Sequence, residues 1–539
     1  MRSFACGLDF GTESARALLL DLATGEEAAV AVHPYAHGIM DRSLPGGRPL
    51  PPLWALQHPA DYLEAARILL GRMCAEARRL GGTVAGIGID STASSPLPAR
   101  ADGTPLALVD AFRDQPHAYV KLWKHHAAEP HAQAINAAAP PFLKYYGGKT
   151  SAEWSLAKAW QVLDEAPQVW DAAERWIEAG DWLVWQLAGE EVRSICQAGY
   201  KAHWQPEWGG YPDRQTLQQL HPGLETWVDR LAPPRPVGTP AGGLTRRWAD
   251  ATGLPEGTPV AVAVIDAHAA VPGVGVRSPG ILVLVLGTSS CHMVMSRAAR
   301  PAPGIAGIVD GGILPGYYGY EAGQAATDDM LEWWVRILGW DAGRHPDALF
   351  DKLNAEAAGL SGPSGLVALD WWNGCRTPLM DASLKGVLTG MTLAVTPAQI
   401  YRALVEATAF GTRVVVETLE AASGSIAEVR ATGGLSRTEF IVQIYADVLG
   451  REVRVSPSPH ATARGAAVYG AMAAGRDADA SPALRPYHPR ATAAYDAAYH
   501  AYRDLFAHFS GASTAPARRR PGADPPPREH NGGRRSTRQ

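Results

Sequence analysis

Cysteine is scarce in this chain of 539 residues, which has five cysteines at scattered positions. No C-x-x-C pair is present, so neither a zinc site nor a disulfide framework is indicated. The motifs G-x-S-x-G, H-E-x-x-H and G-x-G-x-x-G after a strand are also missing, which leaves hydrolases, zinc proteases and Rossmann dehydrogenases without support. Gly148-Lys149-Thr150 resembles the end of a Walker A loop, but Leu143 replaces the first glycine of that motif and excludes it.

Long apolar runs are also missing, and no run approaches the length that spans a bilayer. The first residues reach Asp9 too soon for the apolar core of a signal peptide. We therefore expect a cytoplasmic protein with no membrane partner. Charged residues make up only 19% of the chain and hydrophobic residues 46%, which is typical of globular enzymes.

The net charge is unevenly distributed along the chain. The formal net charge is −5, but residues 511–539 hold seven arginines against Asp524 and Glu529, a net charge of +5 that leaves −10 for the rest. An acidic body argues against nucleic acid as the main ligand. Residues 509–539 are rich in arginine, proline and glycine and have too few apolar residues to order themselves, so we predict a disordered tail there.

The length of the chain exceeds what one hydrophobic core supports, so we predict two domains, residues 1–278 and 279–508, with a cleft between them. Each domain opens on a strand, a Gly-Thr turn and a second strand, at residues 7–22 and 281–295. Two such hairpins half a chain apart indicate duplicated domains. The first domain also contains a tryptophan-rich segment, 123–208, that we expect to be an insertion of short helices and loops.

The first hairpin is typical of a phosphate-binding turn. Gly11 lets the backbone approach an anion, the hydroxyl of Thr12 can donate to it, and Asp9 can hold the metal that accompanies a nucleotide. The alternative is an ordinary turn with no ligand.

Other predicted strands also end in residues that could act in catalysis or binding. The strand predicted over 84–89 leads to Asp90-Ser91-Thr92, and a near-continuous apolar strand over 259–265 stops at Asp266, where a helix opens. A strand ending in Gly433-Gly434 could let a flat ring or a phosphate lie on the backbone. Thr396-Pro397-Ala398-Gln399 is a capping box that predicts a helix to about residue 422.

Together these residues resemble the FGGY carbohydrate kinases. The resemblance covers residues 4 to about 508 and includes Gly386-x-Leu388-x-Gly390-Met391, close to the C-terminal signature of the family. It implies an α/β fold of two duplicated actin/hexokinase-like (ribonuclease H-like) domains around an interdomain cleft. Within the family, four strings are most similar to those of members that phosphorylate L-ribulose, as in arabinose catabolism. They are residues 90–94, 122–126, 318–324 and 370–378.

The resemblance also implies a role for each candidate residue. Asp266 is expected to accept the proton of the sugar's 5-hydroxyl, and Asp9 to hold Mg²⁺ through water. The residues expected to bind ATP are Gly11, Thr12, Arg16, Gly287, Thr288, Gly433 and Gly434. The residues expected to bind the sugar are Thr92, Ala93, Trp123, Lys201, Asp266 and Glu321. The implied partners are a small-molecule sugar and ATP, with a homodimer as a possible assembly.

Several alternatives remain open at this stage. Asp266 could be only a helix cap, Trp123 could pack in a core, and Lys201 with Glu321 could form a surface ion pair. The substrate could be D-ribulose, xylulose or another polyol, and an actin-like or chaperone-like nucleotide switch is an alternative of another class. The chain departs from the usual pattern at His125, where an acid is expected, and at Glu439, where an asparagine is expected.

Overall fold

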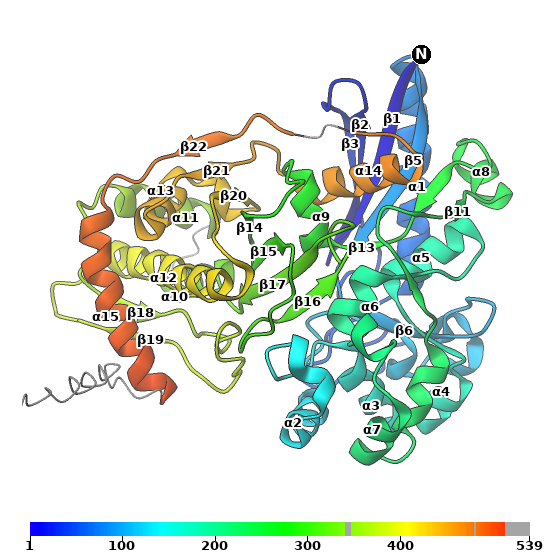
Figure 1. Cartoon of the computed structure of the whole chain (residues 1–539), viewed down its shortest axis with the longest axis horizontal. Helices are drawn as coiled ribbons and strands as arrows, with labels where there is room; N and C mark the ends of the chain where they lie inside the picture. Colours follow the sequence, from blue (N-terminus) through cyan, green and yellow to red (C-terminus); the bar gives the residue numbers. More distant parts are fainter. Residues whose placement is uncertain (340–345, 479–480, 512–539) are drawn as a thin grey trace, which may run out of the picture.

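The computed structural model describes residues 1–339, 346–478 and 481–511. In this part of the chain, two seven-stranded sheets form the centres of two halves (Figure 1). The first sheet contains β1 (Arg2–Phe10), β2 (Ser14–Asp21), β3 (Glu27–Pro34), β5 (Gly82–Ser91), β11 (Pro240–Gly243), β12 (Pro259–Ala261) and β13 (Val264–Ile265). The second contains β14 (Ile281–Leu286), β15 (Ser290–Ser296), β16 (Gly307–Asp310), β17 (Tyr318–Gln324), β20 (Glu428–Thr432), β21 (Val453–Val455) and β22 (Arg485–Tyr487).

The two sheets repeat one topology, which confirms the predicted duplication. In the first, β3, β2 and β1 are antiparallel neighbours, β1 pairs in parallel with β5, β5 pairs in parallel with β12, and β11 closes antiparallel. In the second, β17, β15, β14, β20, β21 and β22 follow the same series of antiparallel and parallel pairings. The two predicted Gly-Thr turns join β1 to β2 and β14 to β15, the first two strands of each sheet along the chain.

Long helices pack against both sheets. Helix α1 (Pro59–Arg79) packs on the first sheet, and α12 (Pro397–Ser423) lies in the core of the second half. Thr396 Oγ1 accepts the N–H of Gln399 while the Gln399 side chain accepts the N–H of Thr396, so the capping box is confirmed. Helices α13 (Glu439–Leu449) and α15 (Thr492–Ser510) pack against each other in the same half.

The predicted continuous strand over 259–265 is wrong in one detail, because it is broken between β12 and β13. Val260 pairs with Ile87, and Val264 pairs with Asp90. This strand therefore takes four steps where β5 takes three, which is the extra residue of a β-bulge. The bulge lies just before Asp266 and sets the direction in which the chain reaches that residue.

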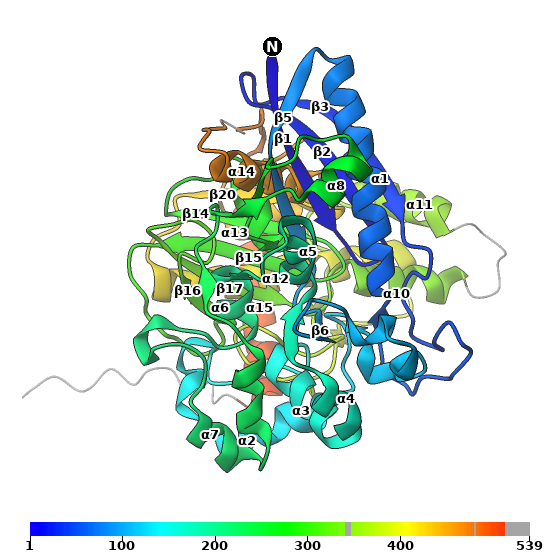
Figure 2. The same cartoon turned by 90° about the vertical axis from the view of Figure 1, so that its right-hand side faces the viewer.

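The tryptophan-rich segment is more ordered than a set of helices and loops. It includes α2 (Glu129–Ala138), α3 (Ser155–Glu165), α5 (Ala179–Ala188) and α6 (Ile195–Lys201), but also two short strands, β8 (Arg175–Glu178) and β9 (Arg193–Ser194). Strand β8 pairs with β6 (Pro96–Ala99), and much of the segment has its own apolar cluster. The segment therefore builds a firm layer beside the end of β5 (Figure 2).

One helix of the second half covers the first sheet. Helix α14 (Ala461–Ala473) lies on β1 and β5 and against α9 (Asp266–Gly273), far from its neighbours in the sequence (Figures 1 and 2). A Cβ atom added to Gly7 or Gly88 would lie 1.8 Å from a backbone oxygen of α14, and one added to Gly86 would lie 2.1 Å from another. Only glycine permits an approach this close.

No helix in the described ranges is both long and apolar enough to cross a membrane. The predicted tail falls mainly on residues 512–539, outside the described residues.

Candidate active site

Three carboxylates meet where strands of the first sheet end. Asp9 on β1 and Asp90 on β5 are paired residues of neighbouring parallel strands. Asp90 in turn pairs with Val264, two residues before Asp266. Since side chains alternate along a strand, Asp9 and Asp90 share one face of the sheet. The charge of Asp9 contributes to raising the pKa of both Asp90 and Asp266.

Asp9 is buried and bonded from both halves of the molecule. Its Oδ2 accepts a hydrogen bond from Arg16 Nη1 at 3.1 Å and another from Thr462 Oγ1 at 2.6 Å. Arg16 belongs to the hairpin, as predicted, whereas Thr462 stands at the start of α14. The side chain of Asp9 thus connects the first hairpin to the second half of the chain.

Asp90 is fully buried, and neither of its carboxyl oxygens has a hydrogen-bond partner among the described residues. Burial, followed by the charges of Asp9 and Asp266, raises the pKa of Asp90 far above its usual range. The sequence places Asp90 at a strand end but predicts no role for it. The available signal was an acid in an otherwise apolar strand, aligned with the end of β1.

Asp266 is the first residue of α9 and not the cap that precedes it. Its Oδ1 accepts the N–H of Ala267 at 2.6 Å. Burial and the nearby charge of Asp9 raise the pKa of Asp266 to about 7. A carboxyl group with that pKa exchanges protons readily near neutral pH, which is the property that a general base requires.

The tip of the first hairpin is held by groups from two other segments. Gly11 N donates to Ser14 O at 3.1 Å and closes the turn. Thr12 Oγ1 accepts the indole N–H of the half-buried Trp123 at 3.1 Å, and the Thr12 carbonyl accepts Gln57 Nε2 at 2.7 Å. Trp123 therefore lies against the hairpin, and its polar edge has a specific partner there.

The predicted sugar segment at Thr92 and Ala93 lies beside this hairpin. Thr92 N donates to the carbonyl of Phe10, the last residue of β1, at 3.1 Å. The hydroxyl of Thr92 lies 3.1 Å from that of Ser95. Two groups of predicted residues, one for phosphate and one for sugar, thus meet at the ends of β1 and β5.

Lys201 and Glu321 form a buried ion pair, so the alternative of a surface pair is wrong. Lys201 Nζ donates to both carboxylate oxygens of Glu321, at 2.8 and 2.9 Å, and the two side chains are only 6% and 8% exposed. The pair joins α6 of the first half to β17 of the second. Burial acts to raise the pKa of Glu321, but Lys201, His268 and Arg376 together outweigh it and the pKa is lowered.

A second ion pair between the halves was not predicted. Arg376 Nη2 lies 3.2 Å from Glu153 Oε1, which joins a loop of the second half to the segment before α3. Burial opposes ionisation of Glu153, but Arg376, His126 and Lys201 lower its pKa to about 2. Arg376 lies within one of the strings that carry the family resemblance, and this was the only signal for it.

The two predicted glycine motifs of the second half lie next to each other. Val285, just before the Gly287-Thr288 turn, pairs with Thr432, just before Gly433-Gly434. Gly433 has φ of +100°, and a Cβ there would lie 2.3 Å from the carbonyl oxygen of Leu286. Gly434 faces open space. No hydrogen bond joins these motifs to the first hairpin within the described part of the chain.

The two departures from the family pattern lie in different surroundings. His125 is fully buried, accepts the N–H of Ala55 on Nδ1 and contacts Gln161 Oε1 at 2.9 Å through Nε2. Burial, with Lys121 and Lys158 nearby, lowers its pKa well below the usual range, so it is a neutral packing residue. Glu439 is exposed and pairs with Arg485 at 2.5 Å.

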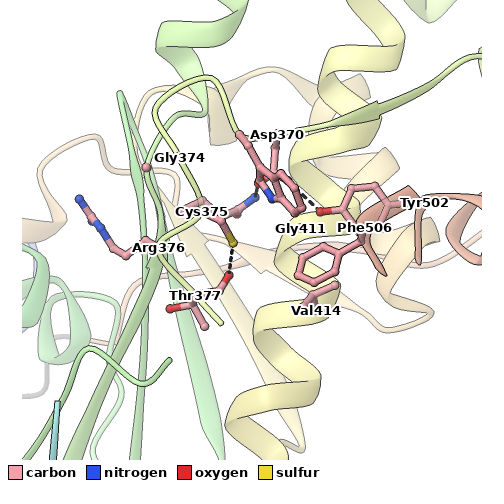
Figure 3. Close-up of a pocket in the computed structure, with 12 residues that line it drawn as sticks. Asp370, Gly374, Cys375, Arg376, Thr377, Gly411, Val414, Tyr502 and Phe506 are labelled. Atoms are coloured by element: carbon pink, nitrogen blue, oxygen red, sulfur yellow. Dashed lines mark hydrogen bonds between the residues drawn. The ribbon is translucent and has the colours of Figure 1, made fainter. Parts of the chain in front are cut away.

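A small cavity lies in the second half, beside the backbone of Arg376 (Figure 3). It has room for about one water molecule, at 10 Å³, and none of the predicted site residues lines it. Asp370 accepts hydrogen bonds there from Gln324 and Tyr502, whereas Arg376 points away from the cavity (Figure 3). Most of the string 370–378 therefore builds the core, and only Arg376 reaches the interface between the halves.

The fold is that of the two-domain sugar kinases. A solved structure described as a "xyloylose kinase" from Brucella ovis superposes with a TM-score of 0.80 at 23% identity, covering 95% of this chain and 100% of its own. A xylulose kinase from Rhodospirillum rubrum superposes with a TM-score of 0.78 at 25% identity, covering 94% of this chain and 98% of its own.

The chain belongs to the FGGY family of carbohydrate kinases: residues 4–273 match the N-terminal domain of the family and residues 282–474 the C-terminal domain. A ribulokinase from Bacillus licheniformis is 44% identical over 525 residues, which cover 92% of this chain and 95% of that protein. A ribulokinase from Mycolicibacterium smegmatis is 42% identical over 531 residues, 94% of each chain.

Proposed function

We propose that the protein transfers the γ-phosphoryl group of ATP to the 5-hydroxyl of L-ribulose, giving L-ribulose 5-phosphate and ADP. The observation that carries this proposal is Asp266, a carboxyl group with a pKa of about 7 at a strand end, close to the Lys201–Glu321 pair. The similarity to ribulokinases over most of the chain supports the choice of sugar.

In the proposed mechanism, Asp266 accepts the proton of the sugar hydroxyl as the new P–O bond forms. Lys201 and Glu321 offer one donor group and one acceptor group to the other hydroxyls, because ion-paired side chains can exchange part of their bonding for a polar ligand. Trp123 supplies a flat wall, and its bond to Thr12 places that wall beside the phosphate hairpin.

The phosphates of ATP would lie between the two Gly-Thr turns. The N–H groups near Gly11 and Gly287, with the hydroxyls of Thr12 and Thr288, are donors of the kind that bind phosphate oxygens. Arg16 adds positive charge, and the open backbone at Gly433 and Gly434 leaves room for the rest of the nucleotide.

The acidic cluster fits a divalent cation. Asp9 supplies hard oxygen ligands, and both oxygens of the neighbouring Asp90 lack another partner in the described structure. We propose that Asp9 holds Mg²⁺ through water, and the ion would neutralise charge that develops on the phosphates.

All five cysteines are free thiols, which supports a cytoplasmic location.

A panel of pentuloses in an ADP-release assay tests the proposal. We expect the highest kcat/KM with L-ribulose, a strict need for Mg²⁺, and loss of at least 100-fold in turnover in Asp266→Asn with ATP binding retained. Asp250→Asn, at an exposed position on the surface, is the matched control. A preference for D-ribulose or xylulose would show that L-ribulose is not the substrate. Unchanged turnover in Asp266→Asn would refute the proposed mechanism.

A further inference from the structure

Lys158 is a fully buried lysine whose three N–H bonds all have partners. Its Nζ donates to the carbonyl oxygens of Ser94 at 2.7 Å, Leu122 at 2.8 Å and Lys121 at 3.3 Å. An ammonium group has three donors and no acceptor, so this set of carbonyls satisfies it completely.

The three carbonyls belong to the two segments that carry the proposed sugar contacts. Ser94 directly follows Ala93, and Leu122 directly precedes Trp123. These segments are about 30 residues apart in the sequence. Ser94 lies between β5 and β6, whereas Lys121 ends the short strand β7 (Val120–Lys121) and Leu122 follows it. The single ammonium group of Lys158 on α3 therefore ties one wall of the proposed sugar site to the other.

Glu178, the last residue of β8, holds the first of these segments from another direction. Its carboxylate accepts Ser94 Oγ at 2.5 Å and the N–H of Ser95 at 2.6 Å. Ser95 Oγ in turn lies 3.1 Å from the hydroxyl of Thr92. The loop between Thr92 and Ser95 is thus held by the buried amino group of Lys158 on its carbonyl side and by the buried carboxyl group of Glu178 on its donor side.

Packing alone does not explain this arrangement. A methionine of similar volume would fill the position of Lys158 without the cost of removing an ammonium group from water. What the methionine could not do is bind carbonyl oxygens of two separate segments at once. The amino group of Lys158 therefore holds those segments in position.

We propose that Lys158 and Glu178 are positioning residues that set the spacing between the Thr92–Ala93 segment and Trp123, and thereby the choice of pentulose. This inference rests on the proposed function, because it takes these two segments as the walls of the sugar site. Within the described ranges, neither side chain has a hydrogen bond to Asp266 or to the two Gly-Thr turns, so we expect neither to act on the nucleotide.

The test compares Lys158→Met and Glu178→Gln with a matched control, Lys121→Met. Lys121 is also fully buried, but its ammonium group lies 4.5 Å from the centre of the Trp54 ring and has no hydrogen-bond partner among the described residues. All three variants are assayed for the KM of the sugar, the KM of ATP and the ratio of kcat/KM between L-ribulose and D-ribulose.

We expect Lys158→Met to raise the KM of the sugar about tenfold or more and to lower the preference between pentuloses, with the KM of ATP within twofold of wild type. Glu178→Gln should show the same pattern more weakly, and Lys121→Met should match wild type. If Lys158→Met fails to fold, Glu178→Gln decides the question. Equal sugar KM values and preferences in Glu178→Gln and Lys121→Met would overturn the inference.

The wild-type panel separates this result from a failure of the proposed function. A wild-type enzyme that prefers another pentulose changes the identity of the sugar, and the comparison of variants is then made with that sugar. A wild-type enzyme that phosphorylates no pentulose refutes the proposed function and this inference together.

Discussion

Replacing Asp266 with asparagine should stabilise the protein while it removes the proposed activity. The pKa of Asp266 is raised from 3.8 to about 7, mainly by burial and then by Asp9. Folding therefore favours the protonated acid and opposes the carboxylate. A rise of about three pKa units corresponds to about 4 kcal/mol at high pH, since each unit is worth about 1.4 kcal/mol.

The sign of the pH dependence follows from this shift. Below about pH 4, Asp266 is protonated in both the folded and the unfolded protein, so it does not lower the free energy of unfolding. As the pH rises towards 7, the unfolded chain loses this proton first, so the free energy of unfolding of the wild type falls. Asparagine does not titrate, so Asp266→Asn lacks this loss.

Urea unfolding of both proteins at pH 5 and pH 8, in buffer with EDTA, measures the effect. We expect Asp266→Asn to gain about 2–3 kcal/mol on the wild type between these two pH values. Asp250→Asn, which removes an exposed carboxyl group, should follow the wild type at both. An advantage of Asp266→Asn that does not grow with pH would show that Asp266 is not held as a buried acid.

Two further changes test the contacts between the halves. Glu321→Gln leaves the Lys201 ammonium buried without its anion, so it should lower the free energy of unfolding by about 3–5 kcal/mol and raise the KM of the sugar. Adding Lys201→Met should restore stability but not activity. A wild-type melting curve for Glu321→Gln alone would contradict the buried pair. Gly88→Ala brings a Cβ to 1.8 Å from the Ala466 carbonyl oxygen and should cost about 1–3 kcal/mol or more, measured by thermal unfolding. In Gly71→Ala, on α1, the added Cβ would lie 3.9 Å from the nearest atom, the carbonyl oxygen of Thr252, so this variant should be neutral or stabilising by up to about 1 kcal/mol. Equal melting of both variants would refute the close packing.

Local patterns were enough to predict much of the fold. The Gly-Thr turns near Gly11 and Gly287, the capping box at Thr396 and the strand end at Asp266 each depend on a few neighbouring residues. Hydrogen-bonding residues and glycines at such places act on their own backbone, so their effect can be seen in a single sequence.

Contacts between distant residues could not be predicted in the same way. The bond from Thr462 to Asp9 joins residues 453 positions apart, and the three carbonyls around Lys158 come from two segments. The bulge before Asp266 depends on the register against β5, which the apolar pattern of one strand does not contain. The burial of Lys201 with Glu321 likewise exists only once the halves have met.

The position of α14 has a consequence for synthesis on the ribosome. The strands of the first sheet are translated long before α14, whose backbone closes their glycine-lined face. A nascent chain that ends before α14 therefore presents bare strands to the surrounding water and to chaperones. A gene cut between the two halves should give fragments that need each other, so that separate expression yields insoluble protein and co-expression restores it.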